Sequence, residues 1–169
     1  MNWDAIGAIG EILGAIGVIV TLAYLAIQIR HNTKVARAAT RQAISDSTVG
    51  IVSDLTSSDS MADIMVRAFE GESLTKAESF RLHARCYRDM KHFENMYHQL
   101  NSGLLPNDEL SSFRENLKVI LVAAPYVEYW KLESSLFSPQ FQTEVSILLK
   151  QIAVQPAHES IVSRLQAIE

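Results

Sequence analysis

A run of 18 residues without a charged side chain, from Ile12 to Ile29, constrains the fold of this chain most strongly. A bilayer-spanning helix needs about 20 mostly apolar residues, and Gly7 to Gly10 can extend the run outward. Because lipid offers the backbone no hydrogen-bond partners, an isolated span has to be helical. The sequence therefore predicts a transmembrane helix within residues 1–29.

Two other interpretations of this run are open. A cleaved signal peptide has a basic segment before the apolar run and a small-residue cleavage site after it. Here the acidic residues Asp4 and Glu11 precede the run, and an Arg-rich stretch follows it. The core helix of a soluble protein is the second alternative, but this run is apolar around its whole circumference, which favours a membrane span.

The distribution of charge predicts the orientation of the span. All 15 Lys and Arg residues lie at or after Arg30. The cations nearest to the apolar run are Arg30, Lys34, Arg37 and Arg41. Because such cations gather on the cytoplasmic side of a span, we expect the N-terminus outside and the C-terminal domain in the cytoplasm. The same side chains could contact anionic lipid headgroups.

Small and polar residues fall on one stripe of the predicted span. They are Gly7, Gly10, Gly14, Gly17, Thr21 and Gln28. Small residues let a second backbone approach closely, and the chain has no second predicted span to fill that place. We therefore expect an interface with another copy, or with a different membrane protein. Glu11 lies beside the stripe near the outer boundary, where headgroups and the positive helix end can accommodate its charge.

The remainder predicts an all-α protein, because no convincing run has the period of a strand. Residues 30–56 continue the span as one helix, which Gly50 could bend and which ends at the Ser-rich stretch 57–60. Residues 57–155 are expected to form a cytoplasmic helical bundle. Residues 156–169 are expected to form a short amphipathic helix or tail, with Ile161, Leu165 and Ile168 on one face.

Helix boundaries within the bundle have clear signals. Gly71 ends a short first helix, and Thr75 with Glu78 forms a T-x-x-E capping box that opens the next, which ends at Gly103. A third helix follows Pro106 and is broken by Pro125, and the aromatic stretch 126–137 is expected to be helical. Ser138 caps a last helix that begins at Pro139. The residues predicted for one face of the second helix are Phe80, His83, Cys86, Tyr87, Met90, Phe93, Tyr97 and Leu100.

The sequence holds no convincing catalytic, cofactor or metal site. The candidate metal ligands on one helix are His83, Cys86, Asp89, His92, Glu94 and His98. The helical wheel separates them into an apolar face, an Asp89–His92 pair and a Glu94–His98 pair, whereas zinc requires three or four convergent ligands. Cys86 fits a small buried apolar side chain. The net charge of −4 argues against a nucleic-acid-binding protein.

Two segments resemble a known family. The stretch from Tyr24 to Thr33 has the pattern Y-L-A-x-Q-I-R-x-N-T after a glycine-rich span, and residues 101–110 and 128–145 are similar to the C-terminal half of the same family. This family consists of small uncharacterised bacterial proteins, common in proteobacteria. The resemblance implies a bacterial inner-membrane protein, and it supplies no site residues.

Three functions are compatible with these features. The first is a homo-oligomeric, membrane-anchored interaction or scaffold protein without enzymatic activity. The second is a channel or pore subunit, in which a ring of N-terminal helices brings Glu11 and Gln28 to a lumen. The third is a metal sensor or enzyme that uses His83, Cys86, Asp89 or His92.

Overall fold

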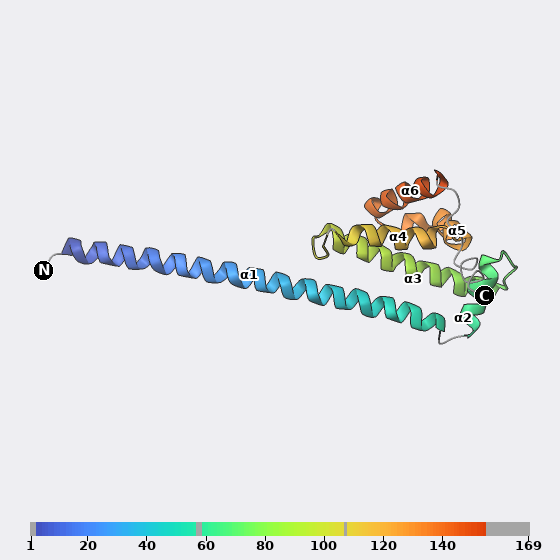
Figure 1. Cartoon of the computed structure of the whole chain (residues 1–169), viewed down its shortest axis with the longest axis horizontal. Helices are drawn as coiled ribbons and strands as arrows, with labels where there is room; N and C mark the ends of the chain where they lie inside the picture. The colour runs from blue at the N-terminus through green and yellow to red at the C-terminus, as the bar shows by residue number, and fades with distance from the viewer. Residues whose placement is uncertain (1–2, 57–58, 107, 155–169) are drawn as a thin grey trace. The chain divides into compact units, whose positions relative to one another are not determined.

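A computed structural model describes residues 3–56, 59–106 and 108–154 of the protein, and most of them are helical. Within those ranges there is no strand, which confirms the all-α prediction. The elements, shown in Figure 1, are α1 (Trp3–Thr56), α2 (Asp59–Phe69), α3 (Lys76–Asn101), α4 (Glu109–Leu121), α5 (Ala124–Glu133), the short 3₁₀ helix η1 (Ser134–Leu136) and α6 (Pro139–Val154). The predicted helix around Ile161, Leu165 and Ile168 lies outside the described residues.

Contacts divide the chain into an N-terminal unit, Met1–Thr40, and a C-terminal unit, Arg41–Glu169. Helix α1 is continuous across Gly50, so the bend considered for that glycine does not interrupt it. Residues 30–56 continue the N-terminal helix, and contacts group those from Arg41 onward with the C-terminal unit. The reason is that Ile44 and Leu55 pack against the hydrophobic core of that unit.

The N-terminal unit consists of the first part of α1. Among the described residues, α1 is the one helix long and apolar enough to cross a membrane, and no residue of its most apolar 18-residue window is buried. Large side chains such as Ile12, Ile16 and Ile19 are exposed. The described chain therefore does not use this segment as a core helix.

In the C-terminal unit, α3 is the central helix and contacts α2, α4 and α5 (Figure 1). Helix α4 also contacts α5 and α6. The side chains that are almost completely buried come from α2, α3, α4 and α6; they include Ile64, Cys86, Met90, Phe113, Leu117, Leu121, Phe141, Val145 and Leu148. On α4 and α6 these buried residues recur every three or four positions, so each helix turns one apolar face to the core.

The helix ends around α3 match the sequence signals. Thr75 Oγ1 accepts the backbone N–H of Glu78, and the Glu78 carboxylate accepts the backbone N–H of Thr75, so the capping box is complete. Gly71 and Gly103 have φ values of 77° and 71°. Only glycine adopts this left-handed conformation without strain, which explains why both loops turn where the sequence places these residues.

Three local predictions hold only in part. Helix α4 ends at Leu121, before Pro125, because the extended backbone of Ala123 separates it from α5. Pro125 lies in the first turn of α5, where a missing N–H costs no hydrogen bond. The aromatic stretch 126–137 is helical as α5 only to Glu133 and then becomes η1. The Ser138 hydroxyl does not cap α6 but lies 3.2 Å from His98 Nε2.

The predicted apolar face of α3 is buried only in part. Cys86 and Met90 are buried, but Phe80 is 75% exposed, and Tyr87 and His83 are also exposed. Each step of three residues falls about 60° short of a full turn. Phe80 therefore lies about 120° around the helix from Cys86, although a continuous 3-residue spacing connects them.

Candidate functional site

The predicted stripe of the N-terminal unit is open along its length. A Cβ atom built on Gly7, Gly10, Gly14 or Gly17 would meet no described atom within 4 Å. The Thr21 hydroxyl donates to the Gly17 carbonyl oxygen at 2.8 Å, so it is satisfied within the same helix. Gln28 Nε2 likewise donates to the Tyr24 hydroxyl at 2.8 Å. Glu11 is exposed beside the stripe. The stripe therefore needs no polar partner and offers a shallow apolar face.

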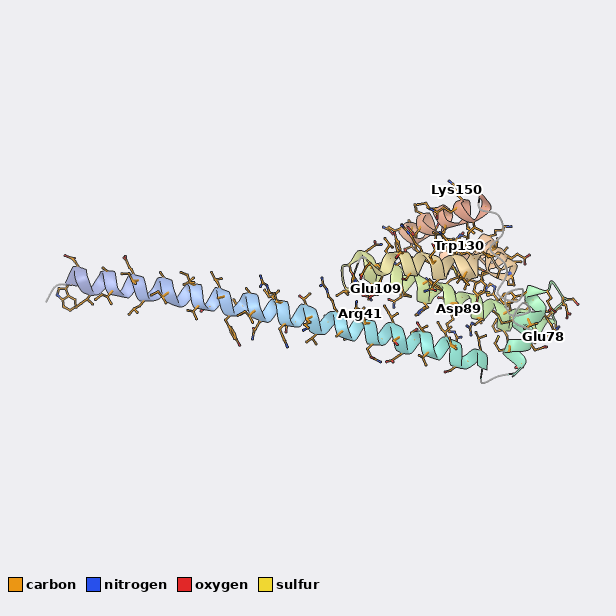
Figure 2. The ribbon with its side chains drawn as sticks, viewed as in Figure 1. Arg41, Glu78, Asp89, Glu109, Trp130 and Lys150 are labelled. Atoms are coloured by element: carbon orange, nitrogen blue, oxygen red, sulfur yellow. The ribbon has the colours of Figure 1, made fainter. Side chains whose placement is uncertain are left out.

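The four cations that follow the apolar run differ in their surroundings. Arg30, Lys34 and Arg37 are exposed. Arg41 is also exposed, but its Nη2 donates to Glu109 Oε1 of α4 at 2.7 Å (Figure 2). Arg41 is thus partly neutralised by the bundle, and a contact with a lipid headgroup would compete with Glu109.

The candidate metal ligands of α3 do not converge, and no group of three suitable side chains exists among the described residues. Asp89 and His92, which we expected to pair, face different partners. Glu94 lies near His98, with 4.0 Å between Oε1 and Nε2, and it also accepts the backbone N–H of Ser138. His83 lies 3.6 Å from Glu133 and packs edge-on against a tyrosine ring.

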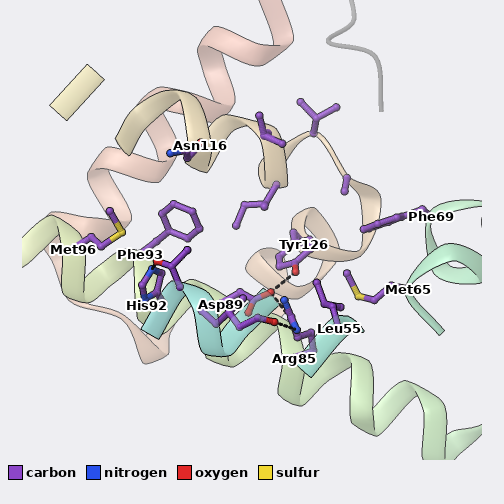
Figure 3. A pocket seen from close by; sticks show the side chains of 16 residues that line it. Leu55, Met65, Phe69, Arg85, Asp89, His92, Phe93, Met96, Asn116 and Tyr126 are labelled. Atoms are coloured by element: carbon purple, nitrogen blue, oxygen red, sulfur yellow. Dashed lines mark hydrogen bonds and ion pairs between the residues drawn. The ribbon is translucent and has the colours of Figure 1, made fainter. Parts of the chain in front are cut away.

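Sequence reasoning missed a buried polar network between α3 and α5. Arg85 Nε donates to Asp89 Oδ2 at 2.7 Å, and both side chains are more than 90% buried. The Tyr126 hydroxyl donates to the same oxygen at 2.5 Å. Arg85 Nη1 donates to the Ile51 carbonyl oxygen of α1 at 3.1 Å. Figure 3 shows how these groups tie the end of α1 to α3 and α5.

The network changes the chemistry of the groups around it. Burial, reinforced by the charge of Asp89, raises the pKa of the Cys86 thiol to about 12. The thiol is therefore protonated at neutral pH and is a poor nucleophile, in keeping with a structural role for Cys86. Burial and the same carboxylate also raise the pKa of Tyr126, so this hydroxyl remains a hydrogen-bond donor across the physiological range.

His92 connects α3 to α1 one turn beyond the network. Its Nδ1 lies 2.9 Å from the Ser47 hydroxyl and its Nε2 lies 3.2 Å from the Thr48 hydroxyl. Burial lowers the pKa of His92, while Asp89 opposes that shift. The neutral imidazole favoured at pH 7 can donate with one nitrogen and accept with the other, which matches two hydroxyl partners.

A cavity of about 480 Å³ lies above the network, between α1, α2, α3, α4 and α5 (Figure 3). Most of its walls are apolar. The residues that line it are Thr48, Ile51, Leu55, Met65, Phe69, Arg85, Asp89, His92, Phe93, Met96, Asn116, Val119, Ile120, Val122, Ala123 and Tyr126. This volume falls within the ~300–1,000 Å³ typical of small-molecule sites, and the ionic network forms one end of it.

A weak signal for this site exists in the sequence. Arg85 and Asp89 are four residues apart, so they share a side of α3, and each is adjacent to a position of the apolar face, Cys86 or Met90. An opposite-charge pair at the border of a buried face is a candidate for burial. The third member, Tyr126, is 37 positions from Asp89, and no local pattern predicts that separation.

Comparison with known proteins gives no indication of function. No family model, curated protein or solved structure matches the chain.

Proposed function

We propose that this protein is a single-pass membrane protein that self-associates through the glycine stripe and presents its helical bundle in the cytoplasm as an interaction or scaffold domain. The observation that carries the proposal is the charge-free run of residues 12–29, whose large apolar side chains are exposed. We further propose that this membrane is the inner membrane of a bacterium, as the family resemblance implies.

Exposure of so many apolar side chains supports the membrane assignment. Contiguous apolar patches larger than a few hundred Å² are rare on soluble monomers and mark interfaces with proteins or membranes. Here the apolar residues surround the helix, so a partner protein on one side would leave the other side in water. Lipid covers all sides at once, which makes a bilayer the better occupant.

The exposed cations at the end of the run support the orientation. Arg30, Lys34 and Arg37 lie within eight residues of Ile29, where positively charged side chains remain on the cytoplasmic face. The bundle follows them in the chain, which supports a cytoplasmic location for it. The same three side chains lie at headgroup level and would attract anionic lipids.

The stripe supports self-association because it has the shape that helix packing in lipid requires. Lipid tails are as apolar as the helix, so association depends on close van der Waals contact between backbones. Gly10 and Gly14 form a G-x-x-x-G pair, and the space beside both is open in the described chain. A second copy offers a matching surface through the same residues.

The test is the mass of the detergent-solubilised full-length protein by native mass spectrometry, for wild type, Gly14→Leu and Ala23→Leu. Both substitutions add a large apolar side chain to the span, but Ala23 lies on the side opposite the stripe. We expect a discrete homo-oligomer for wild type and Ala23→Leu, and monomer for Gly14→Leu. A monomeric wild type, or equal behaviour of the two variants, would refute self-association through the stripe.

The membrane assignment has a separate test, so failure of the membrane assignment can be distinguished from failure of self-association. In spheroplasts, protease added from outside should spare a C-terminal epitope tag and degrade it only after lysis. Release of the protein from membranes by alkaline carbonate would refute the anchor. Degradation of the tag in intact spheroplasts would refute the orientation.

A further inference from the structure

We propose that the cavity of the helical bundle binds a neutral, largely apolar small molecule that presents a hydrogen-bond acceptor, such as a ketone or ester carbonyl, to Arg85. This would add ligand binding to the scaffold role. It rests on the C-terminal unit alone and does not depend on the membrane span or on self-association.

The size and walls of the cavity favour an apolar occupant. The cavity measures about 480 Å³ and is partly open to solvent, so a small molecule can enter it. An ordered water needs about two to four polar partners, and the walls formed by Leu55, Phe69 and Ile120 offer none. Met65 and Met96 also line the cavity, and flexible thioether side chains adapt to ligands of irregular shape.

The charges at the polar end favour a neutral occupant. Arg85 and Asp89 form a buried ion pair, so their charges cancel. The neighbouring Arg88 is paired with Asp54, and its Nε lies 3.8 Å from Asp89 Oδ1. A carboxylate or an amine in the cavity would therefore be a buried charge without a free counter-ion, which is strongly unfavourable.

The hydrogen-bond inventory favours an acceptor on the ligand. A guanidinium carries five N–H donors, and the structure shows two bonds from Arg85, to Asp89 and to the Ile51 carbonyl. The Tyr126 hydrogen is already donated to Asp89. Arg85 lines the cavity beside Leu55 and Tyr126 (Figure 3). Asp89 Oδ1 is a buried acceptor without a hydrogen-bond partner among the described residues, and Arg88 Nε lies 3.8 Å from it. The N–H groups of Arg85 that remain outnumber this single oxygen, so the polar end has an excess of donors that a carbonyl oxygen on the ligand can satisfy.

Acetophenone and ethylbenzene make a matched pair of probes, because they differ mainly in the carbonyl group. Binding to the full-length protein in nanodiscs would be measured by NMR, with protein-free nanodiscs as the reference for partition into lipid. We expect acetophenone to bind on the order of tenfold more tightly than ethylbenzene after this correction, since a hydrogen bond to a charged group exceeds ~1.4 kcal/mol. A ¹³C-labelled carbonyl should shift downfield, which an apolar cavity alone would not cause.

Two variants locate the binding without disturbing the network. Ala123 lines the cavity, whereas its neighbour Ala124 is exposed and does not. Ala123→Phe should abolish binding of both probes, and Ala124→Phe should leave it unchanged.

A third variant tests the role of the guanidinium. Arg85→Lys keeps the positive charge but has fewer donors, and it should reduce the preference for acetophenone.

Three results would overturn the proposal. Equal corrected affinities of the two probes would mean that the site recognises no acceptor. Binding that persists in Ala123→Phe would place the probes elsewhere. Absence of binding by wild type, with the bundle folded, would mean that the cavity is not accessible to small molecules.

Discussion

Tyr126 and Tyr129 allow the same chemical change to be made in two opposite environments. Both lie on α5, both are buried, and they are three residues apart. The Tyr126 hydroxyl donates to the Asp89 carboxylate at 2.5 Å. The Tyr129 hydroxyl is buried and has no hydrogen-bond partner among the described residues. Replacing each by phenylalanine removes only the oxygen and keeps the ring.

The expected changes in the free energy of unfolding have opposite signs. A hydrogen bond to a charged group contributes about 1.5–3 kcal/mol, so Tyr126→Phe should destabilise the bundle by about that amount. A buried polar group without a partner costs about 1–3 kcal/mol. Tyr129→Phe removes that cost and should leave the bundle unchanged or more stable by about 1 kcal/mol. The ring contact between Tyr129 and His83, with centroids 5.0 Å apart, is retained in phenylalanine.

The assay is urea unfolding of the full-length protein in a non-ionic detergent. The chain has two tryptophans, so a Trp3→Phe background leaves Trp130, which is buried in the bundle, as the sole fluorescent reporter. Micelles keep the N-terminal helix out of the transition. Midpoints at equal slope then give the difference in stability between the variants.

If Tyr126→Phe is as stable as wild type, the hydroxyl contributes no net hydrogen-bond energy and the prediction is refuted. Equal destabilisation by the two substitutions would also refute it, because burial rather than hydrogen bonding would then decide the effect. A change of slope in either variant would indicate a change in the surface exposed on unfolding, and stability would have to be compared by a second probe such as circular dichroism.

Further predictions use the same unfolding assay. Leu117→Ala should lower the free energy of unfolding by about 2–5 kcal/mol, because Leu117 is 0% exposed. Leu132→Ala should change it by less than about 0.5 kcal/mol, because Leu132 is 76% exposed. Similar values for the two variants would contradict the assigned core. Gly103→Ala should destabilise the protein by about 1 kcal/mol, because Gly103 has a φ of 71°. Gly50→Ala should stabilise it by about 0.5–1 kcal/mol, because Gly50 lies within α1 and has open space beside it. Stability changes of the same sign in both variants would contradict these backbone conformations. Hydrogen bonds from Arg67 and Thr75 lower the pKa of Glu78 from 4.5 to about 2. Because the folded state holds this carboxylate ionised, its contribution is full above pH ~4.5 and is lost as the pH falls towards 2. Glu78→Gln should therefore flatten the loss of stability between pH 5 and 2, and an unchanged slope would exclude Glu78 as a source of it.

Local features of the fold could be predicted because their causes are local. The complete capping box of Thr75 and Glu78 and the glycine turns at Gly71 and Gly103 follow from groups a few residues apart. The apolar run of α1 and its open glycine stripe follow from composition and from the 3.6-residue period. Where the period had to be followed over several turns, as from Cys86 back to Phe80, small angular errors accumulated and the predicted burial was wrong.

The candidate ligand site depended on tertiary structure. The sequence alone determined that the protein is helical, that one segment suits a bilayer, and where most helices begin or end, because backbone hydrogen bonds and side-chain periodicity act over a few residues. Only the packing of the helices decided that Arg85 and Asp89 are buried, that Tyr126 donates to Asp89 and Arg85 to the Ile51 carbonyl, and that five helices line a partly open cavity. The hydrogen bonds to Tyr126 and Ile51 join residues 37 and 34 positions apart, and their geometry is set by how whole helices pack.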